Sequence, residues 1–379
     1  MPGIWDQGGI ATYIRAISSA QKMAGHEVLF FDTNERKSSR GTDAVAVEYV
    51  PSDKDLFEKA ERRGLDILHL HSELPGHAIA TLPLIRTVHG HQPYCPSGSR
   101  YLKRSATACN RNYSAAGCAW GHVVDRCGSI RPRNFIGNFA RTWREMRRLT
   151  DIPVLAVSRF LKYQMVRSGY SGDLINVLHN PAPDVAEYTP PPPEGHPHFL
   201  FFGRISPQKG VDWLLRAISR ISANVHVDIV GSGDDEHYTH RLTRELNLTD
   251  KVTFYGWLDT NDLATRIAAA RAVVFPSVWH EPAGLMSLEA ASHGRAVIGS
   301  NVGGLTEYLV PGKSALVVQP HSLDGLATAI EKLALDYDLA RAMGICGREW
   351  VRTQFSIARH AEVLLDYYKL AMERMRVSL

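Results

Sequence analysis

The 379 residues exceed what a single ordinary hydrophobic core supports, so two domains of about 180 residues are expected. Hydrophobic residues make up 44% and charged residues 22%, which is typical of a soluble globular protein and excludes a disordered or fibrous chain. No apolar run approaches the roughly 18 residues of a membrane span, and the opening residues are unlike a secretory leader. These features predict a cytoplasmic protein.

Short apolar runs alternate with amphipathic stretches in the first half of the chain, which is typical of βα units in parallel sheets. Strands are predicted over 27–32, 66–71, 84–89, 154–158 and 175–180. Helices are predicted over 9–24, 54–63, 134–149 and 158–168. A doubly wound domain usually opens with a buried strand, yet Gly8 and Gly9 follow no apolar run. Either the first strand is missing or the start is truncated.

Four consecutive prolines, 190–193, cannot join a helix or a central strand, so 186–197 is predicted to be a linker. It separates an N-terminal domain, 1–185, from a C-terminal domain, 198–356. Further strands are predicted over 198–203, 225–231, 252–256, 272–276, 296–300 and 315–318. Further helices are predicted over 211–221, 235–246, 259–270 and 284–292, and a last helix, 357–379, is long enough to cross back onto the first domain.

The stretch FFGRISPQKG places two cations around one turn. A strand ends at Gly203, and Arg204 and Lys209 then flank a proline-containing turn before a helix. The arginine fork and the lysine point charge can close on a diphosphate. The alternative is a pair of solvated loop cations.

Residues 274–304 place two glutamates around a helix mouth. Glu281 lies in the loop after a strand, Pro282 and Gly284 precede the next helix, and Glu289 lies within that helix. Free N–H groups at the helix start favour an anion, and glycine lets it approach. The glutamates can accept hydrogen bonds from hydroxyls, as acidic residues do for a ribose. They are interpreted as clamps on the two ends of a nucleoside-diphospho-sugar, although Glu289 could be an ordinary exposed helix residue.

Weaker signals come from glycines and a histidine. Gly8 and Gly9 form a turn before a helix, and Gly303 and Gly304 open another helix mouth. His89 ends a strand, where substrate groups collect, although a lone histidine is more often structural. It has three competitors: His69, His71 and His91.

Two metal or cofactor signals are weak. Asp53 and Asp55 form an Asp-x-Asp, for which helix capping is favoured over Mg²⁺ binding. The G-x-G at 231–233 lacks the third glycine and the acidic partner of a dinucleotide site, so a nicotinamide cofactor is not supported.

Five cysteines are an odd number without disulfide spacing, which favours reduced thiols. The wide intervals between Cys95, Cys109, Cys118 and Cys127 favour buried or incidental thiols over a structural metal site.

The net charge of +4 conceals a basic segment, 86–167, with 15 basic and three acidic residues. Such an excess indicates an anionic partner. Within it, Phe139, Trp143 and Met146 recur at helical spacing among arginines. Such a helix could lie on anionic lipid, although a surface helix with its apolar stripe in the core is the alternative. No recognisable nucleic-acid module is present, so no nucleic-acid partner is expected.

Taken in order, Gly8-Gly9, FFGRISPQKG, VGSG, VTFYGWL and EPAGLMSLEA resemble the retaining glycosyltransferases of family 4. The resemblance implies an α/β GT-B fold, in which two doubly wound Rossmann-like domains face each other across a cleft. It also implies a hexosyltransferase that uses a nucleotide sugar as donor substrate, with no cofactor and no metal. Ala283 departs from the commonest pattern, in which a bulkier aromatic residue is frequent.

The same resemblance assigns the site residues. Arg204 and Lys209 would neutralise the diphosphate, joined by amides near Gly9 and from Gly284 to Leu285. Glu289 would hold the ribose and Glu281 the transferred sugar. The base would lie by Trp257 and Leu258, and His89 near the reacting face of the sugar. The full donor-binding set is Gly8, Gly9, Arg204, Lys209, Trp257, Leu258, Glu281, Ala283, Gly284, Leu285 and Glu289, and the catalytic set is His89, Glu281, Arg204 and Lys209.

The acceptor is expected to be a glycan or a lipid-linked glycan in polysaccharide or glycolipid biosynthesis, with peripheral contact to anionic membrane through 86–167. Two alternatives share the fold. One is a nucleotide-sugar 2-epimerase, which needs no acceptor. The other is a catalytically silent nucleotide-sugar-binding protein, against which the intact Arg204, Lys209, Glu281 and Glu289 argue.

Overall fold

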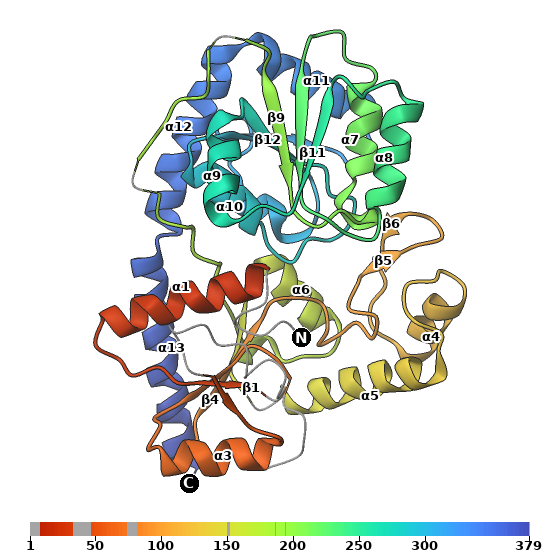
Figure 1. Ribbon diagram of the computed structural model, residues 1–379. Helices are drawn as coiled ribbons and strands as arrows, with labels where there is room; N and C mark the ends of the chain where they lie inside the picture. The colour runs from red at the N-terminus through yellow and green to blue at the C-terminus, as the bar shows by residue number, and fades with distance from the viewer. Residues whose placement is uncertain are drawn as a thin grey trace. The chain divides into compact units, whose positions relative to one another are not determined.

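The computed structural model describes residues 8–32, 47–73, 82–149, 152–185, 187–193 and 195–378. Internal contacts divide the chain into two compact units (Figure 1). Unit 1 comprises Met1–Gly98, Arg133–Pro181 and Ile357–Leu379, and unit 2 comprises Ser99–Pro132 and Ala182–Ser356. The predicted absence of a strand before Gly8 concerns residues outside the described ones.

Unit 2 is built on a six-stranded parallel sheet in the order β11-β10-β9-β12-β13-β14. The strands are β9 (His198–Phe202), β10 (His226–Val230), β11 (Val252–Gly256), β12 (Ala272–Phe275), β13 (Ala296–Ser300) and β14 (Ala315–Val318). Because the chain runs outward from β9 to β11 and then from β12 to β14, the strand order reverses between β9 and β12. This is the order of a doubly wound dinucleotide-binding fold.

Helices cover both faces of this sheet (Figure 1). They are α7 (Val211–Ile218), α8 (Glu236–Glu245), α9 (Thr260–Ala269), α10 (Leu285–Ser292), α11 (Leu323–Leu335) and α12 (Tyr337–Gln354), with 3₁₀ turns η2 (Pro207–Lys209) and η3 (Gly303–Tyr308). Alternate residues of β9 face opposite sides: Phe199 packs in one core with Trp213 of α7, and Leu200 packs in another with Ile267 of α9. Buried parallel strands therefore read as continuous apolar runs.

Residues 99–132 also belong to unit 2, which differs from the predicted domain boundary. They form the antiparallel pair β5 (Tyr101–Leu102) and β6 (Thr107–Ala108) and the helix α4 (Ala115–Val123). Tyr101 is 2% exposed and lies in the core cluster of the α7 face. Burial of this ring fixes the segment to unit 2.

Unit 1 has a four-stranded parallel sheet in the order β3-β4-β7-β8 and a separate pair, β1-β2. The strands are β1 (Phe30–Asp32), β2 (Val47–Tyr49), β3 (Leu68–Leu70), β4 (Leu84–Val88), β7 (Val154–Ala156) and β8 (Ile175–Val177). The helices are α1 (Gly9–Met23), α3 (Asp53–Arg62), α5 (Pro132–Arg148), α6 (Arg159–Arg167) and α13 (Ile357–Ser378), with the 3₁₀ turn η1 (Gly172–Leu174). Leu364 of α13 packs with Tyr13 and Ile17 of α1, so the predicted return of the last helix to the first domain is confirmed.

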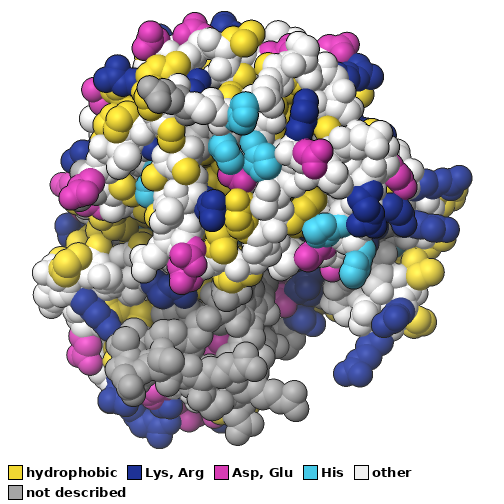
Figure 2. Space-filling view, turned by 45° about the horizontal axis from the view of Figure 1, so that its top comes forward, with side chains coloured by type: hydrophobic (Ala, Val, Ile, Leu, Met, Phe, Trp, Pro, Cys, Tyr) yellow, Lys and Arg dark blue, Asp and Glu magenta, His cyan; other side chains and the backbone are white. Residues whose placement is uncertain are grey.

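Each of the eight internal helices predicted from the sequence corresponds to a helix of the structure. At Asp53 and Asp55 the structure shows a helix start: the Ser52 hydroxyl caps α3 by accepting from the Asp55 N–H, and it donates to the Asp55 carboxylate. No helix among the described residues combines the length and apolar character needed to span a membrane. Lys, Arg, Asp and Glu side chains are interspersed over the face shown in Figure 2.

Candidate functional site

The loops that follow β9 and β12 are held together where the strand order of unit 2 reverses. Gly210 has a φ of 66°, and a Cβ there would overlap the carbonyl of Pro276. The N–H of Val278 donates to the carbonyl of Gln208 at 2.9 Å. In open α/β sheets, ligands bind beside the carboxyl ends of the strands at such a reversal. The two loops therefore form one candidate ligand site.

Lys209 and Glu281 meet at the centre of this site. The Lys209 ammonium donates to Glu281 Oε1 at 2.7 Å, and the two side chains are 17% and 7% exposed. The Ser277 hydroxyl donates to the same oxygen at 2.5 Å, and the ammonium lies 5.9 Å from the centre of the Trp279 ring. A charge-assisted bond with a second donor fixes both side chains. The site thus holds an oriented cation beside an oriented carboxylate.

Arg204 lies at the end of β9 on a fixed backbone. Its neighbours are tied to β10, because the Gly203 N–H donates to Val230 and the Ile205 N–H donates to Ser232, both at 3.0 Å. The side chain itself is exposed and has no hydrogen bond or ion pair among the described residues. A second cation is therefore available at the same strand end as Lys209.

The mouth of α10 is shaped by close packing. A Cβ on Gly284 would lie 2.9 Å from the Tyr308 side chain, so the position accepts only glycine without rearrangement. The Ser287 hydroxyl donates to the Gly284 carbonyl at 2.6 Å, and no side chain caps the N–H groups of this first turn. Leu285 opens the helix. Uncapped N–H groups at a helix start attract anions.

Glu289 lies half-buried inside α10. Among the described residues its carboxylate has no hydrogen-bond or ion-pair partner, and burial raises its pKa from 4.5 to about 7. A desolvated carboxylate is costly unless hydrogen-bonded. Donors from a ligand would relieve that cost. Trp257 and Leu258, which follow β11, are exposed and half-buried respectively, and Ala283 is half-buried.

The backbone of Glu281 is held by η3. The Gly304 N–H donates to the Glu281 carbonyl at 2.6 Å, and a Cβ on Gly303 would overlap the Glu281 backbone. The two glycines predicted to open a helix mouth therefore also position Glu281.

Sequence reasoning missed two contributions to this site. One is Ser277, and its only signal in the sequence is its position just after the predicted strand that becomes β12. The other is residues 99–132, because His280 Nε2 lies 2.6 Å from Asn110 Oδ1 of that segment. Burial, and then the charge of Arg100, lowers the pKa of His280 to about 4. No periodicity in the sequence indicated this contact.

In unit 1, Gly8 and Gly9 begin α1. Gly8 has a φ of 141°, both glycines are exposed, and no side chain caps the helix. An added Cβ on Gly8 would meet open space, so its conformation and not crowding calls for glycine.

His89 follows β4 and joins a cluster of aromatic side chains. Its Nε2 lies 3.1 Å from His71 Nδ1, and the Tyr13 ring packs edge-on at 4.9 Å. Burial is the largest cause of the low pKa of His89, about 3, followed by the charge of Arg86. His69, on β3, also has its pKa lowered to about 3, first by burial. These imidazoles are therefore neutral at physiological pH.

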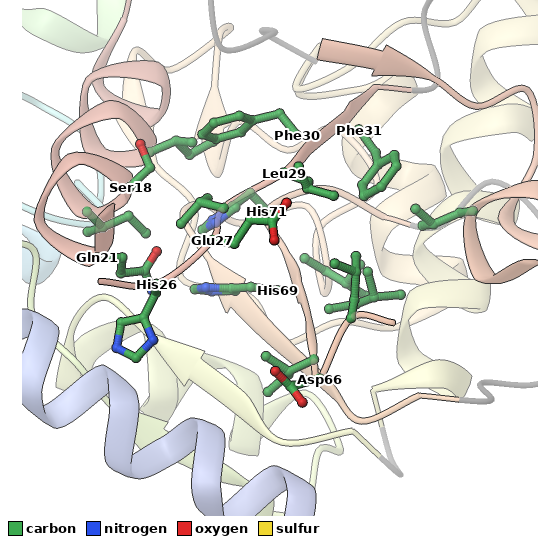
Figure 3. Close-up of a pocket in the computed structure, with 18 of the residues that line it drawn as sticks. Ser18, Gln21, His26, Glu27, Leu29, Phe30, Phe31, Asp66, His69 and His71 are labelled. Atoms are coloured by element: carbon green, nitrogen blue, oxygen red, sulfur yellow. The ribbon is translucent and has the colours of Figure 1, made fainter. Parts of the chain in front are cut away.

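A cavity of about 800 Å³ lies in unit 1 between α1 and the ends of β1 and β3 (Figure 3). Its lining includes Ser18 and Gln21 of α1, Phe31 of β1, and His69 and His71. Within the described residues β1 pairs only with β2, and β3 pairs only with β4. The lining therefore combines polar side chains of α1 and histidines at β3 with an aromatic side chain of β1.

Among the described residues, Cys95, Cys109, Cys118 and Cys127 form no disulfide. In the described part of the chain, no group of metal-ligand side chains that could surround one ion includes a cysteine.

Two family models together cover most of the chain. Residues 189–350 match the model described as glycosyl transferases group 1, and residues 7–184 match glycosyltransferase family 4. The chain is 34% identical over 182 residues to a GDP-mannose-dependent alpha-(1-6)-phosphatidylinositol monomannoside mannosyltransferase of Mycobacterium tuberculosis, covering 46% of this chain and 47% of that protein. The chain spans about half the length of the first curated relatives it matches.

Solved structures share the fold along almost the whole chain. Sucrose-phosphate synthase of Thermosynechococcus elongatus superposes with a TM-score of 0.74 at 22% identity, covering 97% of this chain and 94% of that one. HepE of Anabaena, solved in complex with UDP, superposes with a TM-score of 0.72 at 17% identity, covering 96% and 97%.

Proposed function

Because the chain belongs to the group 1, family 4 glycosyltransferases and has the GT-B fold, we propose that it transfers a hexose from a nucleoside-diphosphate sugar to a hydroxyl of a glycan or lipid-linked acceptor, with retention at the anomeric carbon. The observation that carries the proposal is the buried Lys209–Glu281 pair, held by Ser277 beside the uncapped mouth of α10. This arrangement offers a cation and free N–H groups to a diphosphate, and a carboxylate to sugar hydroxyls.

The donor would lie along the strand ends of unit 2. Its diphosphate would take the Lys209 ammonium, the Arg204 guanidinium and the N–H groups from Gly284 to Leu285. Glu281, still held by Ser277, would accept hydrogen bonds from the transferred sugar, and Glu289 from the ribose. The nucleobase would pack by Trp257 and Leu258. These roles are supported by the positions of the residues after the carboxyl ends of β9, β11 and β12.

In the transfer step, the bond from the anomeric carbon to the phosphate oxygen breaks, and a bond to the acceptor oxygen forms on the same face. The acceptor proton passes to the leaving phosphate oxygen. Negative charge grows on the diphosphate, and fixed cations and helix N–H groups stabilise it. We therefore propose that the reaction needs no divalent metal.

The test is a panel of UDP-, GDP- and ADP-sugars, read first by thermal shift. Stabilisation by one nucleotide, followed by acceptor-dependent release of its diphosphate and an anomer-retaining product, supports the proposal. Product formed without acceptor, with inversion at the sugar 2-position, would identify an epimerase. Binding without turnover over a broad acceptor range would identify a silent binding protein.

His89 is proposed to face the reacting sugar as a neutral group. We expect its replacement, His89→Gln, to lower kcat about tenfold or more while leaving the acidic limb of the kcat/KM profile in place, because the His89 pKa of about 3 lies below the assay range. The measurement is kcat/KM from pH 5 to pH 9 for both proteins. A limb near the ordinary histidine pKa that disappears in His89→Gln would contradict a neutral role.

A membrane-linked acceptor is supported by the outer face of α5. Of the residues predicted as an apolar stripe, Trp143 is 51% exposed, whereas Phe139 and Met146 are half-buried. The outward apolar residues are Trp143 and Ile136, which is 67% exposed, and the Arg147 guanidinium lies 4.2 Å from the centre of the Trp143 ring. Exposed apolar and cationic groups on one helix face suit an anionic lipid surface.

We expect the double variant Ile136→Ser, Trp143→Ser to weaken binding to anionic vesicles by about thirtyfold or more, since each apolar side chain contributes on the order of 1–2 kcal/mol. The exposed Met23→Ser on α1 is the matched control and should float as the natural protein does. Equal flotation of all three proteins, or binding insensitive to salt, would remove the membrane contact.

A further inference from the structure

Two histidines and an aspartate gather at the amino ends of β9 and β10, away from the strand ends that carry the donor site. His198 and His226 are the first residues of the two strands and are paired in register. Asp228 is two residues beyond His226 and so points to the same face of the sheet. Figure 2 shows histidine side chains grouped at the surface around an acidic one.

The three side chains converge on one point. His198 Nδ1 lies 2.9 Å from Asp228 Oδ2, and His226 Nε2 lies 3.7 Å from Asp228 Oδ1. One ligand atom from each residue lies within 4.8 Å of the other two. Zinc bonds of about 2.1 Å in a tetrahedron place ligand atoms about 3.4 Å apart. Small side-chain rotations therefore suffice to surround an ion.

The carboxylate of Asp228 lacks a permanent cation. Its side chain is 3% exposed, and among the described residues its ion-pair partners are the two histidines alone. Oδ1 has no hydrogen-bond partner in that part of the chain. Tyr255 also lies beside this carboxylate. None of these neighbours carries a permanent positive charge, and a bound cation would offset the cost of burying the carboxylate.

The histidines supply nitrogen ligands on the face that carries Asp228. His226 and His198 are paired in register, and each offers one ring nitrogen to the group. The Nε2 of His226 lies 2.8 Å from the Thr253 hydroxyl, a contact that an ion would replace. His198 is 41% exposed at its side chain, which leaves an entry path and room for a water ligand.

We propose that His198, His226 and Asp228 bind one zinc ion per chain, with water in the remaining position. Imidazole and carboxylate ligands in this number suit Zn²⁺. The ion would join the amino-terminal ends of β9, which follows the proline-rich segment, and β10. It would stabilise unit 2 and take no part in sugar transfer, because it lies at the amino ends of the strands and the proposed donor site lies at their carboxyl ends.

The experiment uses the full chain without an affinity tag, stripped with a chelator and titrated with ZnCl₂ at pH 7.5. We expect one equivalent to bind and to raise Tm by several degrees. His198→Ala and Asp228→Asn should each weaken zinc binding by tenfold or more and abolish the Tm shift. His237→Ala, an exposed histidine on α8, is the matched control and should bind as the natural chain does.

Asp228→Asn also separates a lost site from a lost fold. Asparagine keeps the shape of the side chain and can still accept a hydrogen bond from His198, so the Tm of the metal-free chain should stay near that of the natural chain. Reduced zinc binding in that variant then reports the site itself. No saturable binding by the natural chain, or equal zinc affinity in Asp228→Asn and His237→Ala, would overturn the proposal.

Discussion

Lys209→Ala is expected to reduce sugar transfer by a factor of at least 100 and to weaken binding of the nucleoside diphosphate about tenfold. The Lys209 ammonium is the largely buried cation of the proposed donor site, fixed by Glu281 at 2.7 Å. Loss of one fixed donor to a developing oxyanion costs about 10²–10³ in kcat, and a charge-assisted hydrogen bond contributes about 1.5–3 kcal/mol to binding. Turnover and diphosphate affinity, measured separately, test both parts.

Folding must be separated from chemistry in this variant. Removing Lys209 leaves the Glu281 carboxylate, 7% exposed, with the Ser277 hydroxyl as its remaining donor among the described residues. Breaking such a pair destabilises the fold by about 3–5 kcal/mol. The double change Lys209→Met, Glu281→Gln removes both charges and should regain most of that stability without regaining activity. Lys313→Ala, an exposed lysine of unit 2, is the control. Full activity in Lys209→Ala would remove Lys209 from its proposed role.

The alternation of strands and helices in unit 2 was predictable because most of its strands are short apolar runs between amphipathic helices. The paired positions of Lys209 and Glu281 were not, since 72 residues separate them and only the strand order brings their loops together. Only the resemblance to a family indicated from the sequence that both residues belong to one site. It did not reveal Ser277, which acts through Glu281.

Unit 1 was less predictable, for physical reasons. The strand predicted over 27–32 is confined to Phe30–Asp32, and β2 carries no distinct apolar run. The segment 99–132 has wide cysteine intervals and no periodicity, yet Tyr101 anchors it in the core of unit 2. The His71–His89 contact arises from the neighbouring ends of β3 and β4, which a single sequence does not encode locally.

The group of His198, His226 and Asp228 was also not predictable from the sequence. Each residue alone reads as a polar residue that opens or interrupts a strand. Only the parallel register of β9 and β10 places His198 opposite His226 and both beside Asp228. Cross-strand pairing is a property of the fold, so ligand groups built across strands leave no spacing signal in the chain.

Glu289→Gln is expected to stabilise the protein at pH 8 while it weakens donor binding. Burial raises the pKa of Glu289 from 4.5 to about 7, so between these values the folded state holds a proton that the unfolded state has released. The contribution of Glu289 to stability is thus present below pH 4.5 and is lost as pH rises through 7. At pH 8 the charged side chain costs roughly 1–3 kcal/mol, which glutamine avoids.

The measurement is the difference in Tm between Glu289→Gln and the natural protein at pH 5 and at pH 8, without ligand. We expect a clear gain at pH 8 and little at pH 5, with Glu349→Gln, an exposed glutamate of α12, showing neither. Glu289→Gln should instead weaken donor binding, because the ionised carboxylate is the better acceptor for ribose hydroxyls. For the same reason, the affinity of the natural protein for the donor should fall as pH drops below 7. Equal Tm gains at both pH values would contradict the raised pKa of Glu289. Unchanged donor affinity in Glu289→Gln would contradict its proposed role in binding the ribose. Donor binding through this carboxylate, as proposed, would explain why the chain retains a buried glutamate that destabilises the empty fold.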